Sequence, residues 1–111
     1  MPATELPVVI DTYLRTHDAR DTEGSIACFD ADATVIDEER DFTGLARIRW
    51  WLDNAAAEFT FTRTLIDVDQ PEPGVYIVTN HLSGNFPGGE VDLRYRVDLR
   101  AGLIHRLEIA P

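Results

Sequence analysis

The segment from residue 90 to residue 100, EVDLRYRVDLR, constrains the fold more than any other part of the chain. Apolar and charged side chains alternate along its whole length, which is the period of a β-strand with one buried and one solvated face. Tyr95 shares the apolar face with valines and leucines, whereas aspartates and arginines occupy the other face. The pattern predicts a long strand whose inner face, Tyr95 included, packs on a core.

The neighbouring segments predict a meander around this strand. Residues 60–68, 75–84 and 103–110 are rich in β-branched and aromatic side chains, and short turns containing glycine or proline separate them. Strands that follow one another through short turns are typical of an antiparallel sheet. We therefore expect the second half of the chain to form one such sheet.

The first half predicts helices around one short strand. In residues 6–21 apolar side chains recur at spacings of three and four, which is the stripe of an amphipathic helix. Residues 21–29 predict a short second helix, 33–37 a strand and 44–59 a third helix. Three helices and a meander imply an α+β domain with the helices on one face of the sheet. The length of 111 residues fits a single domain, 1–111.

Composition excludes several classes of function. The net charge of −10 argues against binding to nucleic acids or to anionic membranes. The three histidines and the single Cys28 show no ligand spacing, so we expect no metal site. All ten basic residues are arginine, which excludes lysine Schiff-base chemistry. We expect a cytoplasmic protein without a signal peptide or membrane-spanning segment.

The order of elements resembles that of a known superfamily. Tyr13 lies in the first predicted helix, and Asp37 ends the DATVID strand 24 residues later, before the third helix and the long strands. This arrangement resembles the nuclear transport factor 2-like superfamily, particularly its SnoaL-like polyketide cyclase and ketosteroid isomerase branches. The resemblance covers nearly the whole chain. It implies a cone-shaped fold in which three N-terminal helices pack in a strongly curved antiparallel sheet around one apolar pocket, and a homodimer formed through the sheet face.

The resemblance also implies a chemistry. In ketosteroid isomerases a tyrosine of the first helix donates to the substrate oxyanion, and an aspartate at the end of the first strand is the general base. Tyr13 and Asp37 match these two positions. The family's second donor, a buried acid, falls near Tyr95, whereas Asp98 lies on the outward face. A tyrosine hydroxyl therefore replaces that acid in the resemblance.

The expected function follows from these matches. The chain resembles a cofactor-independent isomerase or polyketide cyclase-like enzyme, in which Asp37 removes a proton next to a carbonyl and Tyr13 stabilises the enolate. The expected ligand is a small apolar or cyclic carbonyl compound. The alternative is a non-catalytic ligand-binding or dimerisation module of the same fold. Taken without the resemblance, Asp37 also fits a strand end that runs into an acidic turn, and Tyr13 fits a core tyrosine.

Further residues are expected to bind the ligand. Asn80 and His81 are adjacent in one strand, so only one of them can face the pocket, and the sequence leaves the choice open. His105 shares a strand face with leucines and an isoleucine. Trp50 and Trp51 are about 100° apart on a helix, so one belongs to the core or pocket wall and the other to the surface or an interface. The expected ligand-binding residues are Tyr95, His81, Trp51, Phe29, Val35, Phe61 and His105.

Overall fold

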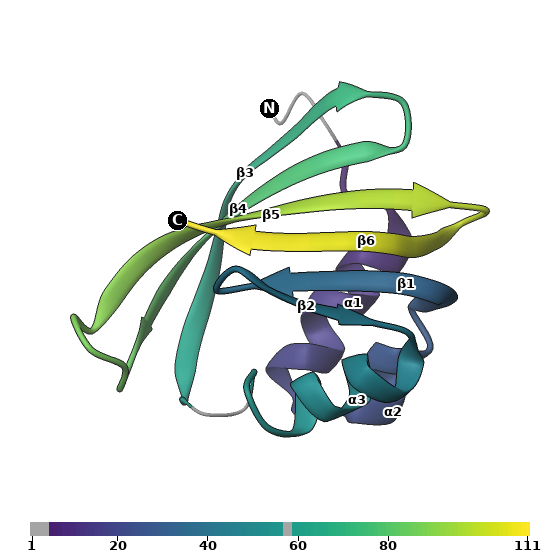
Figure 1. The fold of residues 1–111 in the computed structure, drawn as a ribbon. Coiled ribbons are helices and arrows are strands. Elements are labelled where there is room, and N and C mark those ends of the chain that lie inside the picture. The colour runs from purple at the N-terminus through teal and green to yellow at the C-terminus, as the bar shows by residue number, and fades with distance from the viewer. Residues whose placement is uncertain (1–4, 57–58) are drawn as a thin grey trace.

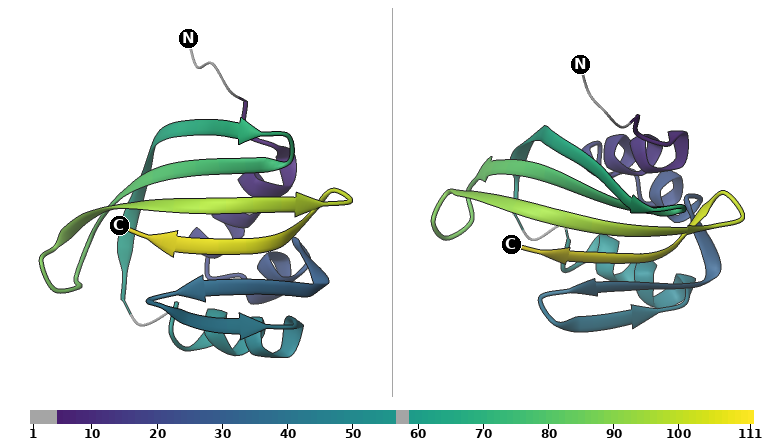
Figure 2. Two further views of the ribbon diagram at one scale, coloured as in Figure 1. Left: turned by 45° about the horizontal axis from the view of Figure 1, so that its top comes forward. Right: turned by 90° about the horizontal axis from the view of Figure 1, so that it is seen from above.

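The computed structural model describes residues 5–56 and 59–111. Six strands form one sheet in the order β2-β1-β6-β5-β4-β3, and the helices lie on one side of it (Figures 1 and 2). The elements are α1 (Val8–Asp18), α2 (Thr22–Ile26), β1 (Phe29–Asp37), β2 (Arg40–Thr43), α3 (Leu45–Asp53), β3 (Phe61–Glu72), β4 (Val75–Gly84), β5 (Glu90–Arg100) and β6 (Leu103–Ala110). The α+β class and the curved sheet agree with the sequence prediction.

Three details of that prediction need correction. The sheet is mixed rather than antiparallel, because β1 pairs in parallel with β6. The acidic segment after Asp37 is a tight hairpin into an additional strand, β2, with Glu38 and Glu39 at φ 52° and 64°. The helices are shorter than expected: α2 has five residues, and α3 ends at Asp53.

Strand β5 has the two faces that its sequence predicted. Tyr95 and Val97 are buried, whereas Arg94 and Arg96 are exposed. The pairing with β4 sets Asn80 opposite Leu93 and His81 opposite Asp92. Because Leu93 shares the inner face with Tyr95, Asn80 faces the inside of the molecule and His81 the outside.

The core lies between the helices and the inner face of the sheet. Its fully buried side chains come from α1, α3, β1, β4, β5 and β6, and include Ile10, Tyr13, Val35, Ile48, Trp51, Val78, Val97, Ile104 and Leu107. Burial of such apolar surface contributes about 25 cal/mol per Å² and is the main stabilising contribution to a domain of this size. This core fixes α1 and α3 against the sheet and thereby positions the side chains described below.

The curvature of the sheet has a local cause. The pairing of β3 with β4 shifts register between Leu65 and Asp67 and again between Asp69 and Glu72. Such bulges bend a strand and increase its twist. Figure 2 shows the long strands β3, β4 and β5 bending strongly at one end of the sheet. Within the described residues, no helix has both the length and the apolar character that crossing a bilayer requires.

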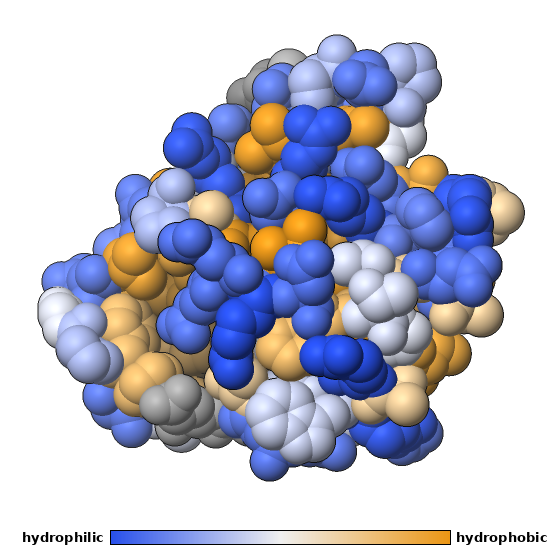
Figure 3. Space-filling model, viewed as in Figure 1, coloured by the Kyte–Doolittle hydropathy of each residue, from blue (hydrophilic) through white to orange (hydrophobic). Residues whose placement is uncertain are grey.

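The outer face of the sheet is mostly polar. Figure 3 shows hydrophilic residues over most of this side, with hydrophobic residues in small patches between them. Several of the charges pair within the chain, as in Arg96 with Asp98 and Arg106 with Glu108, both at 3.4 Å. Exposed pairs of this kind contribute little to stability.

Candidate functional site

A cavity of about 660 Å³ lies between the inner face of the sheet and the helices. Its size is in the range of small-molecule sites. Aromatic and acidic side chains dominate its wall: Trp51, Phe59, Phe61, Phe86 and Tyr95 on the one hand, and Asp37, Glu38, Glu39 and Glu90 on the other. The cavity therefore combines apolar surface with a concentration of carboxylates.

Asp37 borders this cavity from the end of β1. The indole Nε1–H of Trp51 donates to its Oδ2 at 3.0 Å. Burial raises the pKa of the Asp37 carboxyl above its ordinary value, while the hydrogen bond from Trp51 opposes that shift. The other carboxylate oxygen, Oδ1, has no side-chain partner among the described residues. Asp37 is thus a partly desolvated carboxylate that the Trp51 side chain and the Glu38 backbone stabilise by hydrogen bonds.

Tyr13 lies in the core beside the cavity. Its side chain is 1% exposed, and it is not among the residues that border the cavity. The ring contacts Phe29 edge-on at 5.4 Å and stacks on His17 at 5.7 Å. Its hydroxyl is buried and has no hydrogen-bond partner in the described part of the chain. Burial, the neighbouring Tyr95 and Asp37 all raise the Tyr13 pKa, so the phenol stays protonated at neutral pH.

Tyr95 is buried on the inner face of β5 and does border the cavity. Burial raises its pKa to about 12, with Arg63 acting in the opposite direction and Asp37 in the same one. Asp37 thus acts electrostatically on both tyrosines. The carboxylate of Asp37 therefore lies close enough to both phenols to raise their pKa values.

His17 borders the cavity but was not among the ligand-binding residues predicted from the sequence. It follows Tyr13 by one helical turn, borders the cavity and stacks on Trp51 with ring centroids 6.1 Å apart. Burial lowers its pKa to about 4, so the ring is neutral at pH 7. The signal was present in the amphipathic stripe of residues 6–21, where His17 occupies the last apolar position.

A second missed group is a polar chain from α1 across β3 to β4. Arg63 donates from Nε and Nη2 to the Asp18 carboxylate at 2.8–3.1 Å, and its Nη1 donates to Asn80 Oδ1 at 3.0 Å. Asn80 is 0% exposed. Its Nδ2 is the second buried side-chain atom of the described residues that has no partner. Sequence alone gave no reason to connect these three positions, because they are far apart along the chain.

Two expected ligand-binding residues lie elsewhere. His81 faces outward, where Nδ1 contacts Asp92 at 2.6 Å and Nε2 contacts Glu90 at 3.0 Å. His105 contacts Asp30 at 3.0 Å and does not border the cavity. A register shift between Asp98 and Leu99 breaks the alternation in β6, so that Ile104 is buried in place of His105.

The apolar candidates divide into two groups. Trp51 and Phe61 form part of the cavity wall. Phe29 and Val35, at 3% and 0% exposure, belong to the core and do not border the cavity. Trp51 is the buried member of the tryptophan pair, and Trp50 is 52% exposed.

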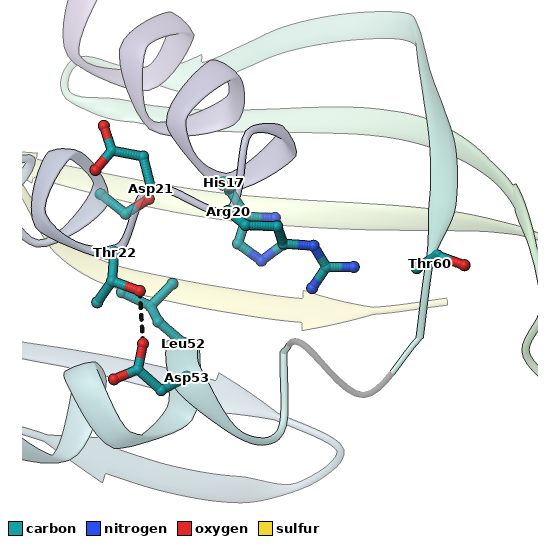
Figure 4. Close-up of a pocket in the computed structure, with 8 residues that line it drawn as sticks. His17, Arg20, Asp21, Thr22, Leu52, Asp53 and Thr60 are labelled. Carbon is teal, nitrogen blue, oxygen red and sulfur yellow. Dashed lines mark hydrogen bonds between the residues drawn. The ribbon is translucent and has the colours of Figure 1, made fainter.

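A smaller hollow of about 390 Å³ also has His17 in its wall, together with Arg20, Thr22, Asp53 and Thr60 (Figure 4). Most of its lining residues carry polar groups, and several of these groups are already hydrogen-bonded to other parts of the chain. The Thr22 hydroxyl donates to Asp53 at 2.5 Å, and the Arg20 guanidinium donates to the carbonyls of Ala56 and Phe59. The larger apolar cavity is therefore the better ligand site. Across the described ranges, no three His, Cys, Asp or Glu side chains cluster as a metal site would require.

Comparisons with known proteins agree with this architecture. No protein-family model matches the sequence, and no curated protein matches it. A candidate polyketide cyclase from Sinorhizobium meliloti superposes with a TM-score of 0.88 and 28% identity over 95% of each chain. A Catenulispora acidiphila protein with a ketosteroid isomerase-like fold, in complex with trimethylamine, has a TM-score of 0.83 and 15% identity over 96% of this chain and 87% of that one.

A third similar structure contains a steroid. This Mycobacterium tuberculosis protein, in complex with estradiol-17β-hemisuccinate, has a TM-score of 0.78 and 19% identity over 94% of this chain and 91% of that one. These likenesses confirm the nuclear transport factor 2-like fold and the predicted resemblance to SnoaL-like and ketosteroid isomerase-like proteins.

Proposed function

We propose that this chain, which has the nuclear transport factor 2-like fold, binds a small neutral carbonyl compound and removes a proton next to the carbonyl. Asp37 is the base, and Tyr13 and Tyr95 stabilise the enolate. The observation that carries the proposal is the partly buried carboxylate of Asp37 at the wall of an apolar cavity, in the electrostatic neighbourhood of two protonated phenols. This is the combination that enolisation needs: one base and donors to the developing oxyanion.

The geometry of Asp37 suits a general base. Burial moves the pKa of the Asp37 carboxyl upward, in the direction of pH 7. A carboxylate with a higher pKa is a stronger proton acceptor while it is still ionised at neutral pH. Trp51 holds Oδ2, which leaves Oδ1 for the substrate proton. When Asp37 takes the proton, its charge disappears and a negative charge develops on the substrate oxygen. Proton transfer with electrostatic stabilisation is sufficient, so the proposal needs no cofactor.

The wall of the cavity supports a neutral ligand. Four carboxylate residues border it, and no arginine does so among the described residues. An anionic ligand would meet like charges in a partly desolvated site, which costs binding free energy. The proteins of similar structure that carry trimethylamine or estradiol-17β-hemisuccinate support the idea that such a cavity accepts small molecules.

The test is hydrogen exchange at carbon. The protein would be incubated with a panel of cyclic ketones and enones in D₂O, and loss of the α-proton signals would be followed by NMR. Asp37→Asn should slow the exchange by about 10²–10⁴-fold, since it removes the base and keeps the shape. Asp69→Asn, an exposed carboxylate of β3 that does not border the cavity, is the matched control and should exchange at the wild-type rate. Equal rates for wild type and Asp37→Asn would contradict the proposal.

The second candidate is a non-catalytic ligand-binding module of the same fold. The observation in its favour is that the Tyr13 hydroxyl does not border the cavity. Trp51 lies in the wall, so quenching of its fluorescence reports binding. A cyclic ketone that quenches Trp51 without exchanging its α-protons would favour the binding module.

The proposed assembly is a homodimer through the outer face of the sheet. The motivation is the resemblance together with the alternating charges of β5. Sedimentation equilibrium measures the mass directly, and Arg94→Glu, which places a new acid on that face, should weaken the dimer. A monomer at all concentrations would contradict this part of the proposal.

A further inference from the structure

A surface hollow of about 520 Å³ lies between strand β2 and helix α3, which are neighbours in Figure 1. Its wall consists of Arg40, Asp41 and Phe42 from the strand, and of Arg47 and Trp50 from the helix. None of these five residues borders the larger cavity that contains Asp37. A volume of this size is in the range of small-molecule sites. The hollow is therefore a candidate site separate from the proposed chemistry.

An aromatic pair forms part of the wall of this hollow. The Phe42 ring stacks on the Trp50 indole with the ring centroids 6.1 Å apart and the planes 21° apart. Phe42 is 5% exposed, whereas Trp50 is 52% exposed, so a large part of the indole is in contact with solvent. A flat aromatic molecule can stack on such an indole and remove its apolar surface from water. The wall thus suits a planar ligand.

Two guanidinium groups lie over the same phenyl ring. The guanidinium carbon of Arg40 is 5.5 Å from the centroid of the Phe42 ring, and that of Arg47 is 6.0 Å from it. At such distances the aromatic ring attracts the cation and holds it in place. Arg47 uses one donor in a long contact of 3.4 Å from Nη2 to the Asp41 carbonyl. Each guanidinium has five N–H donors, so both retain donors for a ligand.

These two arginines have no carboxylate partner within the described residues, although the chain is acidic. It contains 20 acidic residues and ten arginines, and six of the arginines form ion pairs with carboxylates. Two positive charges, of Arg40 and Arg47, and one negative charge, of Asp41, border the hollow. The acids that precede Arg40, Glu38 and Glu39, border the larger cavity instead. A local excess of one positive charge favours a monoanion over a dianion.

We propose that this hollow binds a planar aromatic monocarboxylate, whose ring stacks on Trp50 and whose carboxylate accepts hydrogen bonds from Arg40 and Arg47. The planar fork of a guanidinium matches the two oxygens of a carboxylate. The ring gains apolar contact that a bare anion lacks, and the charge gains attraction that a neutral ring lacks. The site does not depend on the chemistry proposed for Asp37, so either proposal can fail without the other.

The probe is 2-naphthoate, which has a flat ring system and one carboxylate. Trp50 and Trp51 are the two tryptophans of the chain, so a ¹H–¹⁵N NMR spectrum resolves one indole N–H signal on each side of α3. Trp51 donates to Asp37 at the larger cavity and serves as the internal control. Trp50→Phe assigns the two signals by removing one of them. Titration with 2-naphthoate should move the Trp50 signal to saturation and leave the Trp51 signal in place.

Three variants test the charged half of the site. Arg40→Gln and Arg47→Gln should each weaken the binding of 2-naphthoate by about tenfold, the effect of one hydrogen bond between charged groups. Arg15→Gln removes the same charge from an arginine of α1 whose side chain is 77% exposed, and it should change binding by less than about twofold. Equal losses for all three variants would mean that the protein's overall charge, rather than the hollow, attracts the probe, and would overturn the proposal.

Three further compounds test the class of ligand. 2-Naphthalenemethanol keeps the ring system without the charge, and acetate keeps the charge without the ring, so each should bind at least about tenfold more weakly than 2-naphthoate. 2-Naphthyl phosphate, a dianion at pH 8, should also bind more weakly, because Asp41 borders the hollow. Equal binding of 2-naphthalenemethanol and 2-naphthoate, or tighter binding of the phosphate, would overturn the ligand class. No saturable shift of the Trp50 signal, or a shift of the Trp51 signal alone, would overturn the site.

Discussion

Polar side chains on the two faces of the sheet differ in whether they have hydrogen-bond partners. On the outer face charged side chains pair with one another, as His81 does with Asp92 and Glu90. On the inner side the Tyr13 hydroxyl and the Asn80 amide nitrogen are buried without partners. The outer groups have already satisfied one another, whereas these two inner groups are desolvated and have no hydrogen-bond partner among the described residues.

The pKa values of two histidines, His17 and His81, shift in opposite directions on the two faces of the sheet. Burial lowers the pKa of His17 to about 4, whereas the hydrogen bonds from His81 to Asp92 and Glu90 raise the pKa of His81 above its ordinary value of 6.5. The same side chain is therefore neutral at the cavity wall and favours its charged form on the surface. Desolvation sets the protonation state of His17 on the inner side, and pairing with carboxylates sets that of His81 on the outer face.

The largest expected effect distinguishes the two adjacent tryptophans. Trp51 is 1% exposed and holds Asp37, so Trp51→Ala should destabilise the protein by about 3–5 kcal/mol through the cavity it leaves. Trp50 is 52% exposed and stacks on Phe42, so Trp50→Ala should cost less than about 1 kcal/mol. Urea unfolding measures both. Similar losses for the two variants would show that inner and outer positions do not differ as described.

The next effect is the acid sensitivity that His17 confers. The pKa of His17 is about 4 in the folded protein and about 6.5 in the unfolded chain, so the folded protein keeps the ring neutral to lower pH. Acid therefore favours unfolding between these values, and the loss of stability from pH 6.5 to pH 4 should be roughly 2–3 kcal/mol for this group. The free energy of unfolding across this range, measured with urea, gives the slope.

A matched variant isolates His17 from the carboxylates that titrate in the same range. His17→Phe keeps a ring that can stack on Tyr13 and Trp51 but cannot be protonated. Its stability should fall less steeply than that of the wild type between pH 6.5 and pH 4. Identical slopes for the two proteins would contradict the neutral, buried state of His17.

The fold was largely predictable because its main signals are local. The alternation in residues 90–100 and the stripe in residues 6–21 each specify an element and its buried face. The parallel pairing of β1 with β6 was missed, since it joins segments about seventy residues apart whose sequences carry no mark of their partner. Strand β2 was missed because its acidic turn has Glu38 and Glu39 at positive φ, where glycine or asparagine would have been the signal.

The site was predictable only in part. Four of the predicted residues border the cavity: Asp37, Tyr95, Trp51 and Phe61. The alternation of apolar and charged residues in β5 was sufficient to place Tyr95 on the inner face. His105 was misplaced because a bulge in the pairing of β5 and β6 interrupts the alternation. The contact of Arg63 with Asn80 depends on the tertiary packing of α1 over β3 and β4, which no local pattern encodes.

The smallest effect concerns His81 and tests the outer half of the comparison. Its contact with Asp92 is the largest cause of its raised pKa, and the contact with Glu90 is the next. Asp92→Asn should therefore lower the His81 pKa toward 6.5, and Glu90→Gln should lower it less, as measured by NMR titration of the ring protons.

Because its folded-state pKa is raised, His81 stabilises the fold below pH 6.5, and this contribution is lost as the pH rises through the folded-state pKa. His17 should titrate unchanged in both variants, since its pKa is set mainly by burial on the other side of the sheet. A shift of His17 in Asp92→Asn would show that the two faces are coupled, and a wild-type His81 that titrates below 6.5 would show that its contacts do not persist in solution.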